Sequence, residues 1–266
     1  MMLLLDLGNS RLKWALAARH PGSWLAQGAL GWDADLPAQL QLAWAQYPPL
    51  HTAVAASVVD AAREALVAAA VTSKFGCAPR WVRTPASACG VRNAYAEPQR
   101  LGVDRFLAML AAHAAGYAPC VLAGAGTALT LDALAADGQH LGGLIAPGAQ
   151  LMQRSLGVAT VHARADHAGD IVDVARNTAD AVTSGCWHAV AALVERFVQR
   201  MTPALGGAPT LVLGGGDAAH LLPLLTLPAR VMTDGVLHGL AHWTMTDEMA
   251  APATSPDGAD KRAGRP

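Results

Sequence analysis

The sequence is poor in charged residues, and above all in lysine. Only 15% of its 266 residues are charged, the formal net charge is −1, and lysine occurs only as Lys13, Lys74 and Lys261. A chain without a basic excess lacks the electrostatic means of binding nucleic acid or an anionic membrane. We therefore expect neither as a partner.

The sequence also lacks cysteine pairs and long apolar runs. None of the four cysteines, Cys77, Cys89, Cys120 and Cys186, belongs to a Cys-x-x-Cys pair, so reduced thiols are expected. The apolar run 1–5 ends at Asp6 and is too short for a signal peptide or a membrane span. Residues 111–136 are interrupted by Pro119 and Asp132 and read as helix, turn and strand. With no export signal recognised, we expect a cytoplasmic protein, and the 53% hydrophobic composition indicates that it is globular.

Strand-like and helix-like segments alternate along the chain. Segments rich in β-branched residues or leucine predict strands at 3–7, 12–16, 52–59, 80–82, 120–122, 128–134, 141–145 and 210–213. Apolar residues at three- and four-residue spacing predict helices at 60–71, 104–115 and 178–200. This alternation predicts an α/β fold with mixed sheets flanked by helices.

One pattern occurs twice. "LLLDLGNSRLKWAL" (3–16) and "CVLAGAGTALTLDAL" (120–134) each read as a strand, a glycine-bearing turn and a returning strand. The repeat predicts a duplicated domain with a cleft between the halves. We expect an N-terminal domain at 1–117, a C-terminal domain at 118–248 and a disordered tail at 249–266.

The first of these turns has the residues of an anion site. Backbone N–H groups at Gly8, Asn9 and Ser10 would point outward in a tight turn, and Lys13 would add a positive charge. Asp6 would repel a phosphate unless a divalent cation lay between them, so we expect Mg²⁺ there, held through water. On local grounds an ordinary polar hairpin is an equal alternative.

Two further glycine turns follow in the second half. "GAGTALT" (124–130) partly matches a dinucleotide-binding fingerprint, but a strand pattern follows it where that motif needs a helix. A second phosphate turn, with the Thr127 hydroxyl and the Gly126 N–H as donors, fits better. "LGGGDAAHLL" (213–222) opens a helix and would hold a nucleotide's sugar or base, or would simply connect strand and helix.

An acid begins the predicted helix at 104–115. N-terminal capping explains Asp104 alone, because a carboxylate is favoured at a helix N-terminus. Capping does not explain why Tyr95, Arg100, Gly102 and Arg105 gather beside it. An aspartate near a phosphoryl donor can orient or deprotonate a hydroxyl acceptor, and an arginine can hold an acidic substrate.

Together these segments resemble the type III pantothenate kinases, which belong to the superfamily of actin-like ATPases and acetate and sugar kinases. The matching segments, in order, are "DLGNSRLKW", "NAYAEPQRLGVDRFLAMLAA", "GAGTALTLDAL", "GQHLGGLIAPGAQLMQRSL", "RNTADAVTSGCWHAV", "LVLGGGDA" and "DGVLHGL". They cover nearly the whole chain except its tail. The resemblance implies duplicated ribonuclease H-like domains with an interdomain cleft.

The resemblance also implies an activity and a set of site residues. The activity is transfer of the ATP γ-phosphate to the primary hydroxyl of pantothenate, giving 4'-phosphopantothenate in the first step toward coenzyme A. The implied ATP residues are Asp6, Leu7, Gly8, Asn9, Ser10, Arg11, Leu12, Lys13 and Thr127, with Asp6 near Mg²⁺. The implied pantothenate residues are Tyr95, Gly102, Val103, Asp104 as proton acceptor, Arg105, and Thr178 supplied by the partner subunit of a homodimer.

One position departs from the family pattern. The second turn of the family usually begins with an aspartate that binds an activating K⁺ or NH₄⁺, and here that position is Gly124. We therefore expect no strong dependence on a monovalent cation, although backbone carbonyls and water still offer ligands. Two alternatives stay open: a kinase of the same superfamily for another small hydroxy acid or a sugar, and a nucleotide-binding regulatory accessory protein.

Overall fold

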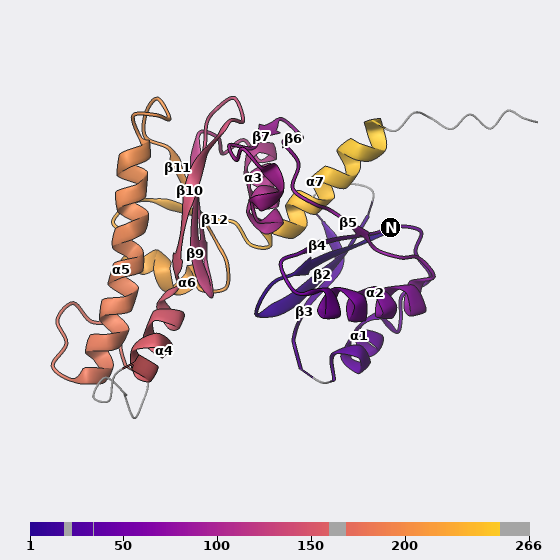
Figure 1. Ribbon diagram of the computed structural model, residues 1–266, viewed down its shortest axis with the longest axis horizontal. Coiled ribbons are helices and arrows are strands. Elements are labelled where there is room, and N and C mark those ends of the chain that lie inside the picture. Colours follow the sequence, from indigo (N-terminus) through magenta and orange to yellow (C-terminus); the bar gives the residue numbers. More distant parts are fainter. Residues whose placement is uncertain (19–22, 34, 160–168, 251–266) are drawn as a thin grey trace, which may run out of the picture.

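The structure is a computed structural model that describes the whole chain except residues 19–22, 34, 160–168 and 251–266 (Figure 1). Of the predicted tail, only positions 249 and 250 are described, and they form the last turn of the final helix. Within the described part of the chain, no helix has both the length and the apolar character that crossing a membrane requires.

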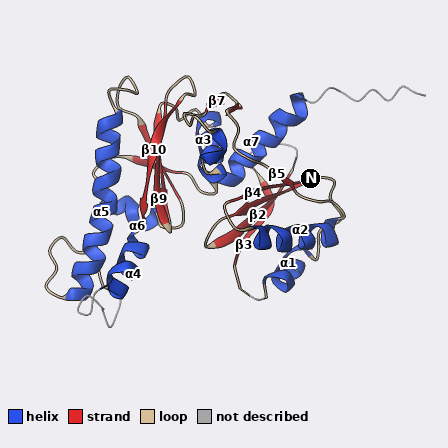
Figure 2. Ribbon diagram, viewed as in Figure 1, coloured by secondary structure: helices blue, strands red, loops and turns tan. Residues whose placement is uncertain are grey.

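Two five-stranded sheets with the same topology form the framework (Figure 2). The first has the order β3-β2-β1-β4-β5, and the second has the order β10-β9-β8-β11-β12. In each sheet the first three strands are antiparallel neighbours, and the last three are parallel neighbours. The predicted duplication and the mixed α/β class are therefore confirmed.

The strands of the first sheet are β1 (Met2–Leu7), β2 (Arg11–Ala17), β3 (Trp24–Gly31), β4 (Ala53–Ser57) and β5 (Arg80–Trp81). Those of the second are β8 (Cys120–Ala125), β9 (Ala128–Leu134), β10 (His140–Pro147), β11 (Thr210–Gly214) and β12 (Ala229–Val231). A small hairpin, β6 (Ser87–Ala88) and β7 (Val91–Arg92), forms a separate two-stranded sheet.

The α-helices are α1 (Leu36–Trp44), α2 (Ala61–Phe75), α3 (Val103–Ala114), α4 (Ala149–Ala159), α5 (Thr178–Met201), α6 (Ala218–Leu221) and α7 (Gly235–Ala250). Two short 3-10 turns are η1 (Pro98–Arg100) and η2 (Leu222–Leu224). Every predicted strand and helix corresponds to one of these elements. The structure adds β3, α1, α4 and α7, among others, which the sequence did not predict.

Both faces of the first sheet are buried, which explains the unbroken apolar run of β1. Leu3 and Leu5 face a core formed with α1 and α2, whereas Met2 and Leu4 face the opposite core. Successive side chains of a strand point to opposite faces, so a strand covered on both sides needs apolar residues throughout. In the second sheet, Val121 and Ala123 of β8 likewise face a core with α5.

The remaining core lies between the two sheets and is built around α3 and α7 (Figure 1). It joins Leu4 of β1 and Leu122 of β8 to Phe106 and Leu110 of α3 and to Leu240 of α7. Helix α7 follows the second sheet in the chain but packs against β1 and β4 of the first. The division at residues 117 and 118 stays a prediction, since the two halves share this core.

Candidate functional site

The first glycine turn joins β1 to β2 as predicted. Leu7 pairs with Leu12, and the Gly8 N–H donates to the Arg11 carbonyl at 3.1 Å. The Trp32 indole N–H donates to the Gly8 carbonyl at 2.8 Å and fixes the turn from the end of β3. The Gly8 N–H therefore closes its own hairpin, so the expectation that it points outward to an anion is wrong.

The second turn, between β8 and β9, lies directly against the first. The hydroxyls of Ser10 and Thr127 are 2.8 Å apart, although the residues are 117 positions apart in the sequence. A strand follows the turn, as predicted, and not the helix of a dinucleotide-binding motif. The Gly126 N–H donates to the Ala128 carbonyl at 3.1 Å, so it too closes a hairpin and is not the free donor predicted.

The third glycine turn, after β11, reaches both of the others and leads into α6 as predicted. Gly215 has a φ of +90°, and a Cβ there would collide with the Ala125 carbonyl oxygen of the second turn. A Cβ on Gly216 would lie 3.1 Å from an Arg11 guanidinium nitrogen of the first turn. Glycine at position 215 lets the third turn meet the second, and position 216 lies beside the Arg11 side chain of the first.

The three turns surround a cavity of about 300 Å³. Nine of the predicted site residues line it: Asp6, Gly8, Asn9, Ser10, Arg11, Lys13, Asp104, Arg105 and Thr127. Gly124 also lines it, and a Cβ there would lie 2.6 Å from the Thr130 hydroxyl oxygen. The Thr130 hydroxyl thus lies where the side chain of an aspartate at position 124 would begin.

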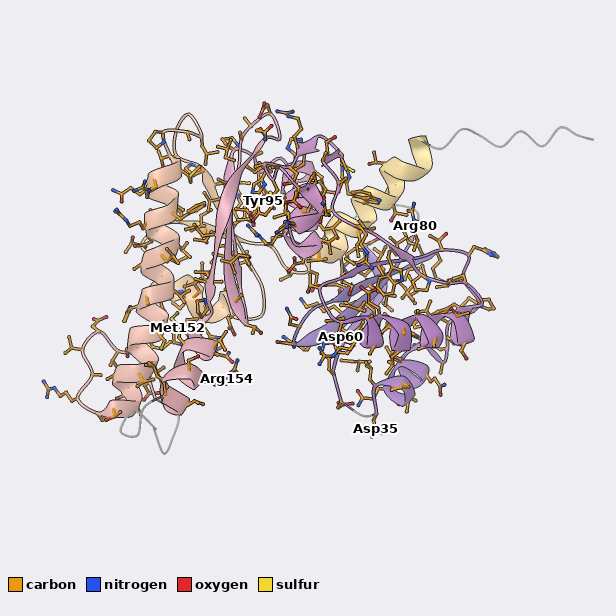
Figure 3. All side chains as sticks on the ribbon, viewed as in Figure 1. Asp35, Asp60, Arg80, Tyr95, Met152 and Arg154 are labelled. Carbon is orange, nitrogen blue, oxygen red and sulfur yellow. The ribbon has the colours of Figure 1, made fainter. Side chains whose placement is uncertain are left out.

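Six predicted site residues are not among the lining residues. Leu7 and Leu12 are fully buried in the core of the first sheet. Gly102 is the N-cap of α3 and Val103 is its first residue. Thr178 is the exposed first residue of α5. Tyr95 is also absent from the lining, and Figure 3 shows it between the second sheet and α3.

Acidic groups converge on one wall of the cavity. The pKa of Asp6 is raised from its usual 3.8 to about 7 by desolvation first and then by the negative charges of Asp104 and Asp234, while the charge of Lys13 opposes the rise. Lys13 Nζ lies 2.9 Å from a carboxylate oxygen of Asp234. Asp234 has a φ of +51°, a left-handed conformation that costs energy in a non-glycine residue. The sequence did not single out Asp234.

Asp104 does not cap its helix. The N-cap of α3 is Gly102, which makes no side-chain bond, and the Asp104 carboxylate accepts a hydrogen bond from the Arg105 N–H at 2.8 Å. Desolvation raises the pKa of Asp104, while the bond from that N–H and the Arg105 charge oppose the rise. A partly buried carboxylate with a raised pKa at a cavity wall has the properties of a general base.

Arg105 is not a free cation. Its guanidinium makes two bonds to Asp132, Nε to Oδ2 at 2.9 Å and a terminal nitrogen to Oδ1 at 2.6 Å. The other terminal nitrogen donates to the Tyr95 hydroxyl at 3.2 Å. Burial by itself would lower the pKa of Arg105, but the bonds and charge of Asp132 and the bond to Tyr95 outweigh it and raise the pKa. An arginine ready to bind an acidic substrate was expected, and the structure gives it a carboxylate partner that the sequence did not reveal.

The duplicated sheets and the three joined turns define the actin-like class of α/β folds. A putative 2-dehydro-3-deoxygalactonokinase from Sinorhizobium meliloti has the same fold, with a TM-score of 0.59 at 14% identity over 94% of this chain and 99% of its own. The sequence comparison is more specific than the fold, because it identifies a family within this class. Residues 2–200 match the family model of type III pantothenate kinase.

Curated relatives agree with that match. The type III pantothenate kinase of Aromatoleum aromaticum is 41% identical over 241 residues, which are 91% of this chain and 96% of the relative. The type III pantothenate kinase of Xanthomonas oryzae pv. oryzae is 44% identical over 244 residues, 90% of this chain and 96% of the relative. The chain belongs to the type III pantothenate kinase family.

Proposed function

We propose that this protein transfers the γ-phosphoryl group of ATP to the primary hydroxyl of pantothenate, giving 4'-phosphopantothenate in the first step of coenzyme A synthesis. One observation carries the proposal: the Ser10 and Thr127 hydroxyls, from turns of the two different sheets, meet at 2.8 Å on a cavity that Asp104 also lines. The names of the curated relatives support the choice of pantothenate.

The triphosphate would lie across the first two turns. Because the Gly8 and Gly126 N–H groups are used within their hairpins, the donors left to it include the hydroxyls of Ser10 and Thr127 and the cationic side chains of Arg11 and Lys13. The third turn, at 214–216, also lines the cavity and would hold the nucleoside. Donors fixed before the reaction can stabilise charge without reorganising.

The acidic wall fits Mg²⁺. The Asp6 carboxylate is a hard oxygen ligand, and its raised pKa reports a site where a nearby positive charge would be strongly favourable. We propose that Asp6 holds Mg²⁺ through water. When bound, Mg²⁺ neutralises charge on the transferring phosphoryl group and its leaving group.

Asp104 would act on the acceptor alcohol. Its carboxylate would orient the hydroxyl of pantothenate and accept the proton late in the transfer, because an alcohol is a far weaker acid than a carboxylic acid. Alignment of this hydroxyl with the γ-phosphorus would supply most of the rate. Tyr95, Gly102, Val103 and Arg105 would shape the acceptor side.

A homodimer completes the proposed pocket. Thr178 is exposed and does not line the cavity of its own subunit, which is compatible with a contact to pantothenate in the partner subunit. Light scattering of the purified protein tests the dimer. Gly124 does not fit a strong K⁺ or NH₄⁺ site, because it offers only a backbone carbonyl and the Thr130 side chain occupies the neighbouring space. A cytoplasmic location stays a prediction from sequence.

The test is a coupled assay of ADP release with ATP, Mg²⁺ and a panel of acceptors: pantothenate, other small hydroxy acids, and sugars. Release that requires pantothenate, with phosphorylated product identified by mass spectrometry, is the expected result. Release with another acceptor instead would favour the related kinase. ATP binding without release on any acceptor would favour the accessory protein.

A further inference from the structure

A buried ion pair forms part of the cavity wall beside Asp104. The Arg105 side chain, on α3, is 5% exposed, and the Asp132 side chain, on β9, is 4% exposed. Both line the cavity, although the two residues are 27 positions apart in sequence. A bidentate bond between a planar guanidinium and a carboxylate fixes the direction of the remaining N–H groups.

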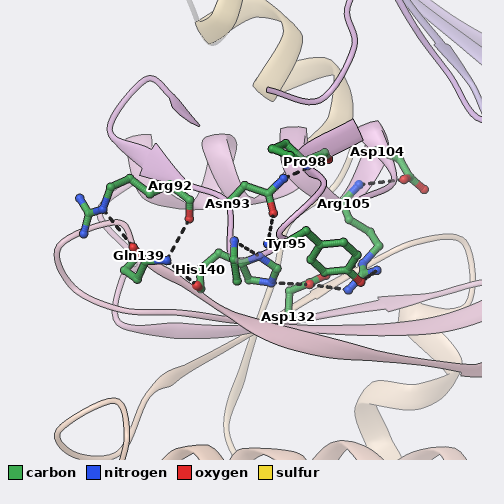
Figure 4. Close-up of polar contacts among 10 residues, drawn as sticks. Arg92, Asn93, Tyr95, Pro98, Asp104, Arg105, Asp132, Gln139 and His140 are labelled. Carbon is green, nitrogen blue, oxygen red and sulfur yellow. Dashed lines mark hydrogen bonds and ion pairs between the residues drawn. The ribbon is translucent and has the colours of Figure 1, made fainter. Parts of the chain in front are cut away.

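His140 supports the pair from β10 (Figure 4). Its ring is fully buried, its Nε2 lies 3.0 Å from Asp132 Oδ1, and its Nδ1 lies 3.4 Å from the backbone N of Ala94. Because the Ala94 N–H can only donate, Nδ1 accepts, and Nε2 carries the ring hydrogen and donates to Asp132. The ring also stacks on Tyr95, with centroids 6.2 Å apart and planes inclined by 16°.

The opposite strand makes room for this network. Gly143 of β10 pairs in register with Asp132. A Cβ on Gly143 would lie 2.6 Å from Asp132 Oδ1 and 2.7 Å from a terminal nitrogen of Arg105. The Leu131 carbonyl oxygen lies closer still, so the backbone and the network together fill the space that a side chain at position 143 would need.

We infer that Asp132, supported by His140, is a positioning residue that directs the remaining N–H groups of Arg105 toward the acceptor substrate. Of the five N–H hydrogens of Arg105, two are held by Asp132 and one by the Tyr95 hydroxyl. Two hydrogens on the terminal nitrogens are left for oxygen acceptors of the hydroxy acid. This inference rests on the proposed function.

Stability alone is a weak reason for such an arrangement, because apolar residues of similar size often replace a buried ion pair without loss. The position of the network gives a better reason. Arg105 directly follows Asp104, so the bonds that hold its side chain also hold the first turn of α3, where the proposed proton acceptor lies. Misplacement of the Arg105 side chain or of this turn would weaken binding of the acceptor substrate and leave nucleotide binding unchanged.

The experiment compares three variants with wild type. Asp132→Asn removes the charge of the carboxylate, His140→Phe keeps a stacking ring but removes both hydrogen bonds, and His140→Gln restores a donor at the place of Nε2. Asp137→Asn is the matched control, because Asp137 lies in the same β9–β10 hairpin and also pairs with an arginine, Arg92, but on the surface. Steady-state kinetics give KM for pantothenate and for ATP, and circular dichroism melts confirm folding.

We expect Asp132→Asn and His140→Phe to raise the pantothenate KM at least about tenfold with the ATP KM unchanged, because small misplacements of binding groups are costly. His140→Gln should recover most of the loss, and Asp137→Asn should match wild type. An unchanged pantothenate KM in the folded variants, or an equal rise in both KM values, overturns the inference.

If Asp132→Asn does not fold, His140→Phe and His140→Gln decide the matter, since both keep the ion pair. A wild-type protein that is inactive on pantothenate is a different result. It refutes the proposed function, and the positioning role falls with it. An active wild type with unaffected variants refutes the positioning role alone.

Discussion

Replacing Asp6 with asparagine should make the protein more stable at high pH. The pKa of Asp6 is about 7 in the folded protein, against the usual 3.8, chiefly because the surrounding protein desolvates the carboxylate. The folded state therefore keeps this proton at a pH where the unfolded chain has lost it. Stability must then fall as the pH rises from about 4 to about 7, and stay low above that.

The size of the effect follows from the same values. Each unit of pH in this interval lowers the free energy of unfolding of wild type by about 1.4 kcal/mol. The rise from pH 5 to pH 7 therefore lowers it by roughly 2 to 3 kcal/mol. Asparagine cannot ionise and should escape this cost. The free energy of unfolding of Asp6→Asn minus that of wild type should thus grow by roughly 2 to 3 kcal/mol from pH 5 to pH 8.

Urea denaturation at pH 5, 6, 7 and 8, without nucleotide or Mg²⁺, measures this difference. Asp35→Asn, a change at an exposed side chain ahead of α1 (Figure 3), is the control and should follow the wild-type curve. Parallel curves for Asp6→Asn and wild type would refute the reasoning, because they would mean that Asp6 titrates alike in the folded and unfolded states. Adding Mg²⁺ and ATP should restore stability to wild type and not to Asp6→Asn.

Three further changes test other parts of the site. Asp104→Asn should lower turnover at least about a hundredfold while nucleotide binding, measured by calorimetry, stays intact; near-normal turnover would remove Asp104 from the mechanism. Ser10→Ala and Thr127→Ala should each raise the ATP KM by about fivefold. Because the two hydroxyls bond to each other, the double variant should raise the ATP KM by less than the product of the two single effects. Independent effects would mean that the two turns do not act together on ATP. Rates in sodium-only and potassium buffers should be similar, since Gly124 supplies no carboxylate; a large potassium requirement would contradict that account.

The sequence predicted best the elements whose apolar residues form an unbroken run or a regular stripe between polar segments. β1 and β8 are apolar runs buried on both faces, and α5 has a regular apolar stripe, so each left a clear pattern. β3 reads "WLAQGALG", whose alanines and glycines give little contrast between the faces of an edge strand. Patterns of this kind do not separate strand from loop.

The site was predictable where a polar group interrupts an apolar segment. Asp6 and Asp104 stand out in this way, and both line the cavity. Asp132 has the same signal, a single acid in an apolar strand, but its role depends on Arg105, which lies on a different element. Asp234 pairs with Lys13 across 221 positions. Such pairings come from the packing of the two sheets around α3 and α7, which local sequence does not encode.

The most direct test of the central claim is a crystal structure with a non-hydrolysable ATP analogue and Mg²⁺. Ser10 and Thr127 should both contact the triphosphate, and Asp104 should face the terminal phosphate across the space left for an alcohol. A nucleotide that touches only one of the two turns, or a terminal phosphate directed away from Asp104, would contradict the account.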